Sequence, residues 1–185
     1  MLKQAILKLA KSAVENYLKK GIIISPPLNL PKELLNKKSG VFVTIKKNNE
    51  LRGCIGTYLP TKNNIAEEII SNAINAAVND YRFDPIQPKE LNQLSYEVYI
   101  LDKPEFKGKI QELKELKEDN LRKLGLNPKK YGVLVKSGFK SGLLLPNLEG
   151  ISKAQDQVLI AAQKGGINPY QEEFEIYCFS AKKYE

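Results

Sequence analysis

Apolar residues recur every three or four positions at the start of the chain, and this spacing predicts an amphipathic helix. The stripe consists of Ile6, Leu9, Ala10, Ala13, Val14 and Tyr17. Gly21 follows it and is typical of a helix C-cap. Lysines interrupt every apolar run of this segment, so the pattern indicates neither a targeting peptide nor a membrane span. We therefore expect a cytoplasmic protein without membrane contact.

A hairpin, a helix and a strand are predicted between residues 40 and 101. The β-branched run Val41–Ile45 and the segment LRGCIG, residues 51–56, flank a polar turn, which is typical of a hairpin. A stripe of small and apolar residues from Ile65 predicts a helix that ends near Asp80. Strict alternation over residues 94–100 then predicts a strand.

The same order of elements recurs in the C-terminal half of the chain. A second hairpin is predicted over residues 133–145, a helix from about Ser152 to Lys164, and a strand over residues 174–178. We interpret this recurrence as a structural echo. The charged stretch Gln111–Lys123 between the halves is either a helix or a mobile insertion.

These elements predict an α+β fold of mixed, mainly antiparallel sheets covered by helices, in two closely joined subdomains. We expect residues 1–185 to form a single domain. Its larger subdomain is built around the hairpin–helix–strand segments 40–101 and 132–181. A smaller part comes from the N-terminal helix, from residues 105–130, or from both.

The charge of the chain raises the question of a polyanionic partner. Lysine and arginine number 29 against 21 aspartates and glutamates, giving a formal net charge of +8. The lysines are scattered rather than gathered into one tract, so a solvated surface is favoured over a nucleic-acid groove. Nucleic acid stays a possible partner that is not favoured.

Missing residue types exclude several kinds of active site. The chain has no histidine, which rules out Ser-His and Cys-His pairs and histidine metal ligands. Its two cysteines, Cys54 and Cys178, are far apart in the sequence and form no CxxC motif, so a zinc cluster within one chain is not expected. We predict no metal and no cofactor.

The segment LRGCIG combines three chemically different groups. Arg52 and Cys54 alternate on one strand and therefore project from the same face of the sheet. Cys54 is either a nucleophile or redox-sensitive thiol activated by neighbouring guanidinium groups, or a small apolar plug. Gly53 and Gly56 either let a ligand approach the backbone or mark a bulge or a backbone crossing.

Arginine usage points to the same region. The chain has 26 lysines but three arginines, and Arg52 and Arg82 lie in the motifs LRGCIG and DYRFDP. A planar guanidinium suits a bidentate carboxylate or phosphate, so both residues could bind an anionic ligand. Alternatively, a buried arginine pairs with Asp80 or Asp84 to fix a loop, or the arginines stand in these motifs by codon chance.

Two further positions are candidates for the same site. Glu97 lies on the strand face opposite Tyr96 and Val98, where it is a general base, a partner of a motif arginine, or a water-facing residue. Tyr81 and Phe83 flank the motif arginine and either stack on a ligand or seal the edge of the core.

Four motifs in this order resemble the AMMECR domain family, whose microbial members are called AmmeMemoRadiSam system protein A. They are GVFVTIKK before LRGCIG, the DxRF pattern, the EV-containing strand and the later GLLLP. The resemblance extends from about Gly40 to Phe179. It implies a two-part α/β fold with the motifs gathered at one cleft, a biochemical function that is unsettled, and association with a Memo-type protein and a radical SAM protein.

Position by position, the resemblance implies a site at the motif residues themselves. These are Leu51, Arg52, Gly53, Cys54, Ile55, Gly56, Asp80, Arg82, Phe83, Leu144, Leu145 and Pro146. Tyr81 and Asp84 stand where the family usually has proline or a small residue, and a tryptophan that many relatives carry after Pro146 is missing. The rim of the cleft is therefore expected to differ.

We expect a small-molecule enzyme or ligand-binding component. In this hypothesis Arg52 and Arg82 hold an unknown small anionic ligand, and Cys54, with Glu97 or Asp80, does any nucleophilic or proton-transfer work. The alternatives are a nucleic-acid-binding or regulatory protein-interaction module without catalysis, and a scaffold that docks partner proteins. Convergence of Arg52, Cys54 and Arg82 around an open cavity favours the first hypothesis, and a flat lysine-lined face favours the others.

Overall fold

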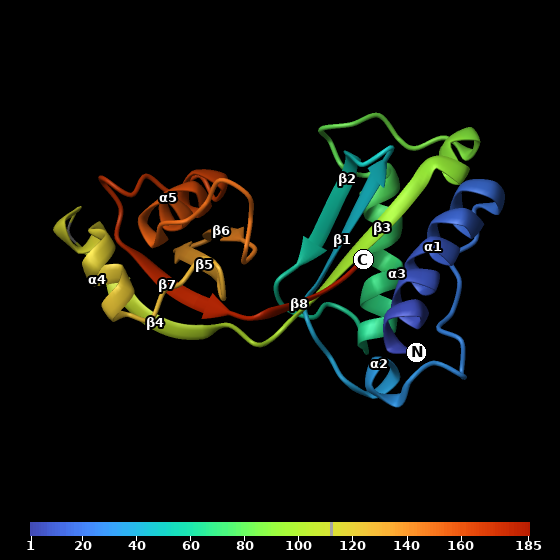
Figure 1. Cartoon of the computed structure of the whole chain (residues 1–185), viewed down its shortest axis with the longest axis horizontal. Coiled ribbons are helices and arrows are strands. Elements are labelled where there is room, and N and C mark those ends of the chain that lie inside the picture. The colour runs from blue at the N-terminus through green and yellow to red at the C-terminus, as the bar shows by residue number, and fades with distance from the viewer. Residues whose placement is uncertain (112) are drawn as a thin grey trace. The chain divides into compact units, whose positions relative to one another are not determined.

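The computed structural model divides the chain into two compact units, each with its own four-stranded sheet (Figure 1). It describes residues 1–111 and 115–185 in full and only the backbone of residues 113 and 114; residue 112, within the stretch Gln111–Lys123, lies outside the described residues. The first unit comprises Met1–Leu101 and Lys182–Glu185, and the second Asp102–Ala181. The predicted α+β class is confirmed. The segments 40–101 and 132–181 lie in separate units.

The first unit packs helices on one sheet. Its elements are α1 (Leu2–Lys20), α2 (Lys32–Asn36), β1 (Val41–Lys47), β2 (Glu50–Thr57), α3 (Ile65–Val78), a 3-10 helix (Pro88–Gln93), β3 (Leu94–Leu101) and β8 (Ala181–Tyr184). The strand order is β2-β1-β3-β8, with β1 antiparallel to both β2 and β3. The predicted stripe of α1 is buried from Ile6 to Val14, and Gly21 adopts the left-handed conformation expected of a C-cap.

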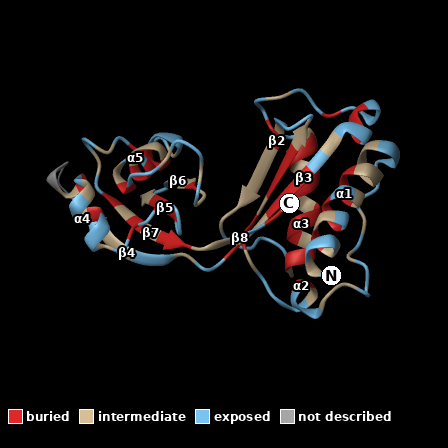
Figure 2. Cartoon of the chain, in the orientation of Figure 1, coloured by how far each residue is buried: buried red, intermediate tan, exposed pale blue. Residues whose placement is uncertain are grey.

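The two faces of this sheet differ because side chains alternate along each strand. On β1, Val41, Val43 and Ile45 are fully buried and join the core made with α1 and α3. The alternate residues of β1, Thr44 among them, project from the opposite face. Figure 2 shows how the buried residues of this unit follow its strands and α3. The sheet therefore has one apolar face that packs on helices and one face with polar side chains.

The second unit repeats this layout with different lengths. Its elements are β4 (Glu105–Ile110), a 3-10 helix (Leu113–Leu116), α4 (Glu118–Lys123), β5 (Gly132–Ser137), β6 (Lys140–Leu144), α5 (Ala154–Lys164) and β7 (Phe174–Phe179). The strand order is β4-β7-β5-β6, and all three pairings are antiparallel. A separate core contains Val133, Val135 and Ile176 from the strands together with the apolar side of α5.

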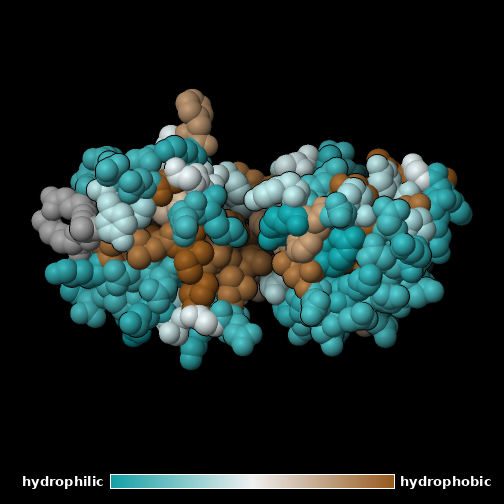
Figure 3. Space-filling view, turned by 90° about the horizontal axis from the view of Figure 1, so that it is seen from above, coloured by the Kyte–Doolittle hydropathy of each residue, from teal (hydrophilic) through white to brown (hydrophobic). Residues whose placement is uncertain are grey.

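Hydrophilic side chains cover much of the surface of both units in the view of Figure 3. Within the described part of the chain, every helix falls short of the length and apolar character that a membrane span requires.

One glycine in each unit lets a helix approach a strand closely. A Cβ added to Gly53 on β2 would lie 2.1 Å from the carbonyl oxygen of Ala76 on α3. A Cβ added to Gly142 on β6 would lie 1.8 Å from the carbonyl oxygen of Ala161 on α5. Both distances are far inside van der Waals contact, so the helices dock only because these positions lack a side chain.

The variants Gly53→Ala and Gly142→Ala are therefore expected to lower the free energy of unfolding by about 2 to 3 kcal/mol each, since backbone must move to admit the methyl group. Urea unfolding followed by circular dichroism measures the loss. Gly108→Ala is the matched control, because its Cβ would meet only the flexible Leu124 side chain at 3.4 Å. A Gly53→Ala protein as stable as the control would contradict this account.

Candidate functional site

The edge of the first sheet is held by side chains instead of another strand. β2 is the edge strand, and Cys54 turns its backbone N–H and C=O away from β1. The N–H of Cys54 donates to Asp80 Oδ2 at 2.8 Å, and Arg82 Nη2 donates to the carbonyl oxygen of Cys54 at 3.2 Å. The motif DYRF thus fixes the backbone of the motif LRGCIG.

Asp80 and Arg82 form the ion pair at the centre of this arrangement. Arg82 donates from Nε to Asp80 Oδ1 at 2.9 Å and from Nη2 to Oδ2 at 2.7 Å, so the guanidinium engages both carboxylate oxygens. Its hydrogen bonds hold the pKa of Asp80 at about 2 despite burial, and the Cys54 N–H adds to this effect. The guanidinium also lies over the Phe83 ring, 5.5 Å from its centroid.

A second bidentate pair secures the same segment farther along β2. Arg52 donates from Nε and Nη2 to the two carboxylate oxygens of Glu90 at 3.1 and 3.0 Å, and from Nη1 to the backbone oxygen of Asp84 at 2.8 Å. Lys47 adds a bond of 2.9 Å to Glu90. The Arg52 bonds outweigh burial and hold the pKa of Glu90 at about 2.

Both motif arginines therefore have carboxylate partners within the first unit. The pairing of Arg82 with Asp80 is one of the two that the sequence analysis considered. Arg52 pairs with Glu90 instead, while Asp84 contributes only its backbone oxygen. A ligand-binding role for either arginine stays a prediction.

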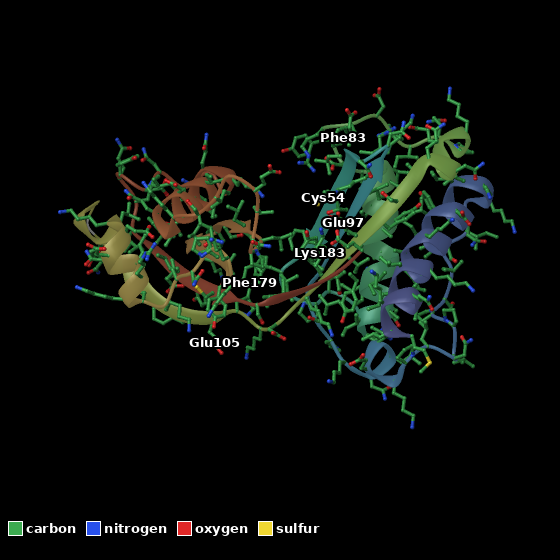
Figure 4. The ribbon with its side chains drawn as sticks, in the orientation of Figure 1. Cys54, Phe83, Glu97, Glu105, Phe179 and Lys183 are labelled. Atoms are coloured by element: carbon green, nitrogen blue, oxygen red, sulfur yellow. The ribbon has the colours of Figure 1, made fainter. Side chains whose placement is uncertain are left out.

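Polar side chains cross the other face of the sheet in a row. In the strand register, Thr44 on β1 lies beside Cys54 on β2 and Glu97 on β3. Thr44 Oγ1 is 3.2 Å from Cys54 Sγ, and Lys183 Nζ on β8 is 3.2 Å from Glu97 Oε1. Figure 4 shows Cys54, Glu97 and Lys183 grouped on this sheet. We call Cys54, Thr44, Glu97 and Lys183 the polar row.

Glu97 is not the water-facing residue that one interpretation of the sequence allowed. It is 8% exposed, and Lys46 on β1 donates to its Oε1 from the side opposite Lys183. Burial acts to lower the pKa of Lys183, but its hydrogen bonds to Glu185 and Glu97 raise that pKa above the ordinary lysine value. The carboxylate is thus held between two ammonium groups.

Packing accounts for the two glycines of LRGCIG. Gly53 faces α3, as described above, and a Cβ on Gly56 would lie 2.2 Å from the Phe42 ring. Their role as ligand-binding residues stays a prediction. Leu144, Leu145 and Pro146 belong to the second unit, and a cleft that joins GLLLP to the other motifs also stays a prediction.

Two carboxylates that organise the first unit are not among the candidates drawn from the sequence. Glu90 follows Pro88 at the start of the 3-10 helix, where it completes a capping box with Gln87; this local pattern is readable from sequence. Glu68 is 1% exposed on α3 and accepts hydrogen bonds from Thr57, Thr61 and Lys62. Burial acts to raise the pKa of Glu68, but these bonds lower it overall.

The two cysteines and the carboxylates among the described residues are the side chains that a disulfide or a metal site would use. Cys54 and Cys178 form no disulfide. Among the residues that the structure describes, no group of three or more cysteine, aspartate or glutamate side chains is placed to hold a metal ion. Burial raises the pKa of the Cys178 thiol to about 11, so this group is expected to be protonated and unreactive at neutral pH.

Comparison with known proteins identifies relatives over nearly the whole chain. The model of the AMMECR1 family matches residues 7–184. A Thermotoga maritima protein is 43% identical over 180 residues, which are 97% of this chain and 96% of that protein. A Clostridium acetobutylicum protein is 42% identical over 92% of this chain but only 34% of its own length. The crystal structure of an uncharacterised Pyrococcus horikoshii protein superposes with a TM-score of 0.83 at 34% identity, covering 96% of this chain and 88% of that one.

Acid is expected to weaken the first unit between about pH 5 and pH 2. The pKa values of Asp80 and Glu90 lie near 2 in the folded chain, below the ordinary carboxyl values of about 4 that apply when it is unfolded. The two carboxylates therefore contribute their full share to the free energy of unfolding when the pH is above their pKa in the unfolded chain. This contribution is lost as the pH falls through their pKa in the folded chain. Urea unfolding at a series of pH values measures this loss.

Asp80→Asn should reduce the free energy of unfolding by about 2 kcal/mol at pH 7. It should also make that free energy fall less steeply with decreasing pH on the acid side. Asp84→Asn is the matched control, because the exposed Asp84 engages Arg52 through its backbone oxygen. If both variants showed the same acid limb as the parent protein, the ion pair would not be a source of this stability.

Proposed function

The chain belongs to the AMMECR1 family, and from this premise we propose that its first unit binds a small anionic molecule at the polar row. The protein would act as a ligand-binding component or as an enzyme on that molecule. The observation that carries the proposal is the polar row itself, in which a thiol, a hydroxyl, a carboxylate and an ammonium group lie side by side on neighbouring strands. Folding alone does not require such a row, because apolar residues pack a sheet face with less cost of desolvation.

Ammonium groups beside the polar row favour an anion as the ligand. Lys46 and Lys183 both contact the carboxylate of Glu97, and Lys183 also pairs with Glu185. Two carboxylates thus balance these two ammonium groups, and the neighbouring ion pair of Asp80 and Arg82 is neutral overall. The side chains of Lys46 and Lys183 are 32% and 36% exposed, so their ammonium groups are accessible as donors to a negatively charged group.

The spacing of the polar row sets what each group could do. Cys54 and Glu97 lie on strands two positions apart, which separates their backbones by about 10 Å. Thr44 lies between them, so the carboxylate does not contact the thiol directly. Cys54 would act at one end of a bound molecule as the nucleophile candidate, and Glu97 at the other as the proton acceptor.

Association with a Memo-type protein and a radical SAM protein, which the motif resemblance implies, stays a prediction. The Clostridium acetobutylicum relative extends well beyond the matched region. The activity and partners of that longer protein do not transfer to this chain.

Alkylation of Cys54 with an anionic and a neutral reagent tests the proposal. Iodoacetate and iodoacetamide attack thiols alike but differ in charge. If the polar row attracts anions, the iodoacetate-to-iodoacetamide rate ratio at Cys54 should exceed that of free cysteine at least threefold at low salt and fall as salt screens the charges. Mass spectrometry of the modified peptide measures both rates. Cys54→Ser should abolish the reaction, since the Cys178 thiol is buried and protonated.

Two adjacent lysines on β8 provide the variant and its control. Lys183→Gln removes the ammonium beside Glu97 and should bring the rate ratio back to that of free cysteine. Lys182→Gln removes an equal charge next to it, over the Tyr184 ring, and should leave the ratio high. A ratio that matches free cysteine in the parent protein, or a Cys54 that reacts with neither reagent, would refute an accessible anion site at the polar row.

A further inference from the structure

The second unit carries a groove whose charged lining residues are all basic. It has a volume of about 730 Å³ and lies at α4, at the loop of residues 125–131 and at the start of α5. Arg122, Lys129, Lys130 and Lys153 contribute its charges, and Asn127 and Ser152 add polar groups. No carboxylate belongs to this lining among the residues that the structure describes. We call it the cationic groove.

This concentration of charge is not a general property of the second unit. Residues 102–181 contain thirteen lysines and arginines against eleven aspartates and glutamates, so the unit is nearly neutral. A second hollow of this unit, near Lys109 and Lys136, is lined by glutamates as well as lysines. Elsewhere, Lys140 pairs with Glu172 at 2.8 Å. The lining of the cationic groove therefore differs from that of this second hollow, because it contains basic residues without glutamates.

The cations of the cationic groove are largely unneutralised. Arg122 uses its Nε to bond Glu118 at 2.8 Å, and its side chain is otherwise mostly exposed. In the part of the chain that the structure describes, Lys129, Lys130 and Lys153 have no ion-pair partner. These three lysines repel one another and the partly neutralised Arg122, and this cost is relieved when an anion binds between them.

The loop that presents two of these lysines is fixed by backbone hydrogen bonds. The carbonyl oxygen of Asn127 accepts from the N–H groups of Lys130 and Tyr131 at 2.9 and 2.8 Å. The carbonyl oxygen of Pro128 accepts from the N–H of Asn147 at 2.7 Å, and Gln157 Nε2 donates to the carbonyl oxygen of Tyr131 at 2.9 Å. Because this loop is already ordered, a ligand would bind to it at little cost in backbone conformational entropy, which favours affinity.

We propose that the cationic groove binds a compact ligand with at least two phosphate groups, such as a nucleoside diphosphate. Ammonium, guanidinium, amide and hydroxyl groups are the donors that phosphate oxygens accept, and Tyr131, 40% exposed, offers a ring on which a base stacks. A nucleic-acid strand is less well matched, because its charge extends beyond the groove over a nearly neutral surface. This site is independent of the polar row.

Isothermal titration of the whole chain with inorganic pyrophosphate, ADP and AMP tests the proposal. Pyrophosphate and ADP should bind, AMP should bind at least tenfold more weakly, and all affinities should fall as salt is raised. Lys129→Gln combined with Lys130→Gln should weaken ADP binding at least tenfold. Tyr131→Leu should weaken ADP but not pyrophosphate.

Matched variants separate this site from other cationic surfaces. Lys123→Gln removes an exposed charge next to Arg122 but outside the groove lining, and should leave ADP binding unchanged. Lys183→Gln, which disrupts the polar row, should also leave it unchanged. Absence of binding by both pyrophosphate and ADP, or binding that survives the double lysine variant, would overturn the proposal. So would tighter binding of a 20-nucleotide single strand than of ADP, which would indicate an extended nucleic-acid surface.

Discussion

The ion pair between Asp80 and Arg82 is the constraint on which the first unit depends. An edge strand leaves backbone groups unpaired, and the two side chains satisfy those of Cys54 on β2 from outside the sheet. The same contacts hold the segment of residues 80–90 beside β2, where Glu90 meets Arg52. One motif thus stabilises the other, and the thiol of the polar row is positioned as a result. Arg52 and Arg82, which the sequence suggests as ligand donors, thus stabilise this edge of the sheet through their ion pairs and backbone contacts.

The two units repeat one construction. In the first unit, the hairpin β1-β2 is followed by the helix α3 and the strand β3, and the strands lie in the order β2-β1-β3. In the second unit, the hairpin β5-β6 is followed by the helix α5 and the strand β7, and the strands lie in the order β6-β5-β7. The neighbouring strands in both of these orders are antiparallel. Each hairpin also has its helix-facing glycine on the second arm, Gly53 in one and Gly142 in the other. LRGCIG and the strand that contains Gly142–Leu144 therefore occupy equivalent places, although the thiol and the arginine belong to the first alone.

The sequence predicted those features that depend on local periodicity. The stripe of α1, both hairpins and the alternation of β3 follow from spacing, and their limits differ from the structure by a few residues at most. Partners distant in sequence were not predictable in this way. Glu90 lies 38 residues from Arg52, and Glu97 lies 86 residues before Lys183, so only the folded chain shows that these charges meet. Glu68 could have been recognised from the sequence, because it is a charged residue on the apolar side of a predicted helix.

The return of β8 to the first sheet has a consequence for the order in which the molecule is made. β1, β2 and β3 leave the ribosome together with α1 and α3, but the strand that carries Lys183 follows only after the entire second unit. Until then the nascent sheet is one strand short, and Lys46 alone neutralises Glu97. Translation thus delays completion of the polar row, and a chain interrupted anywhere within the second unit would present this surface without the ammonium of Lys183 and the carboxylate of Glu185.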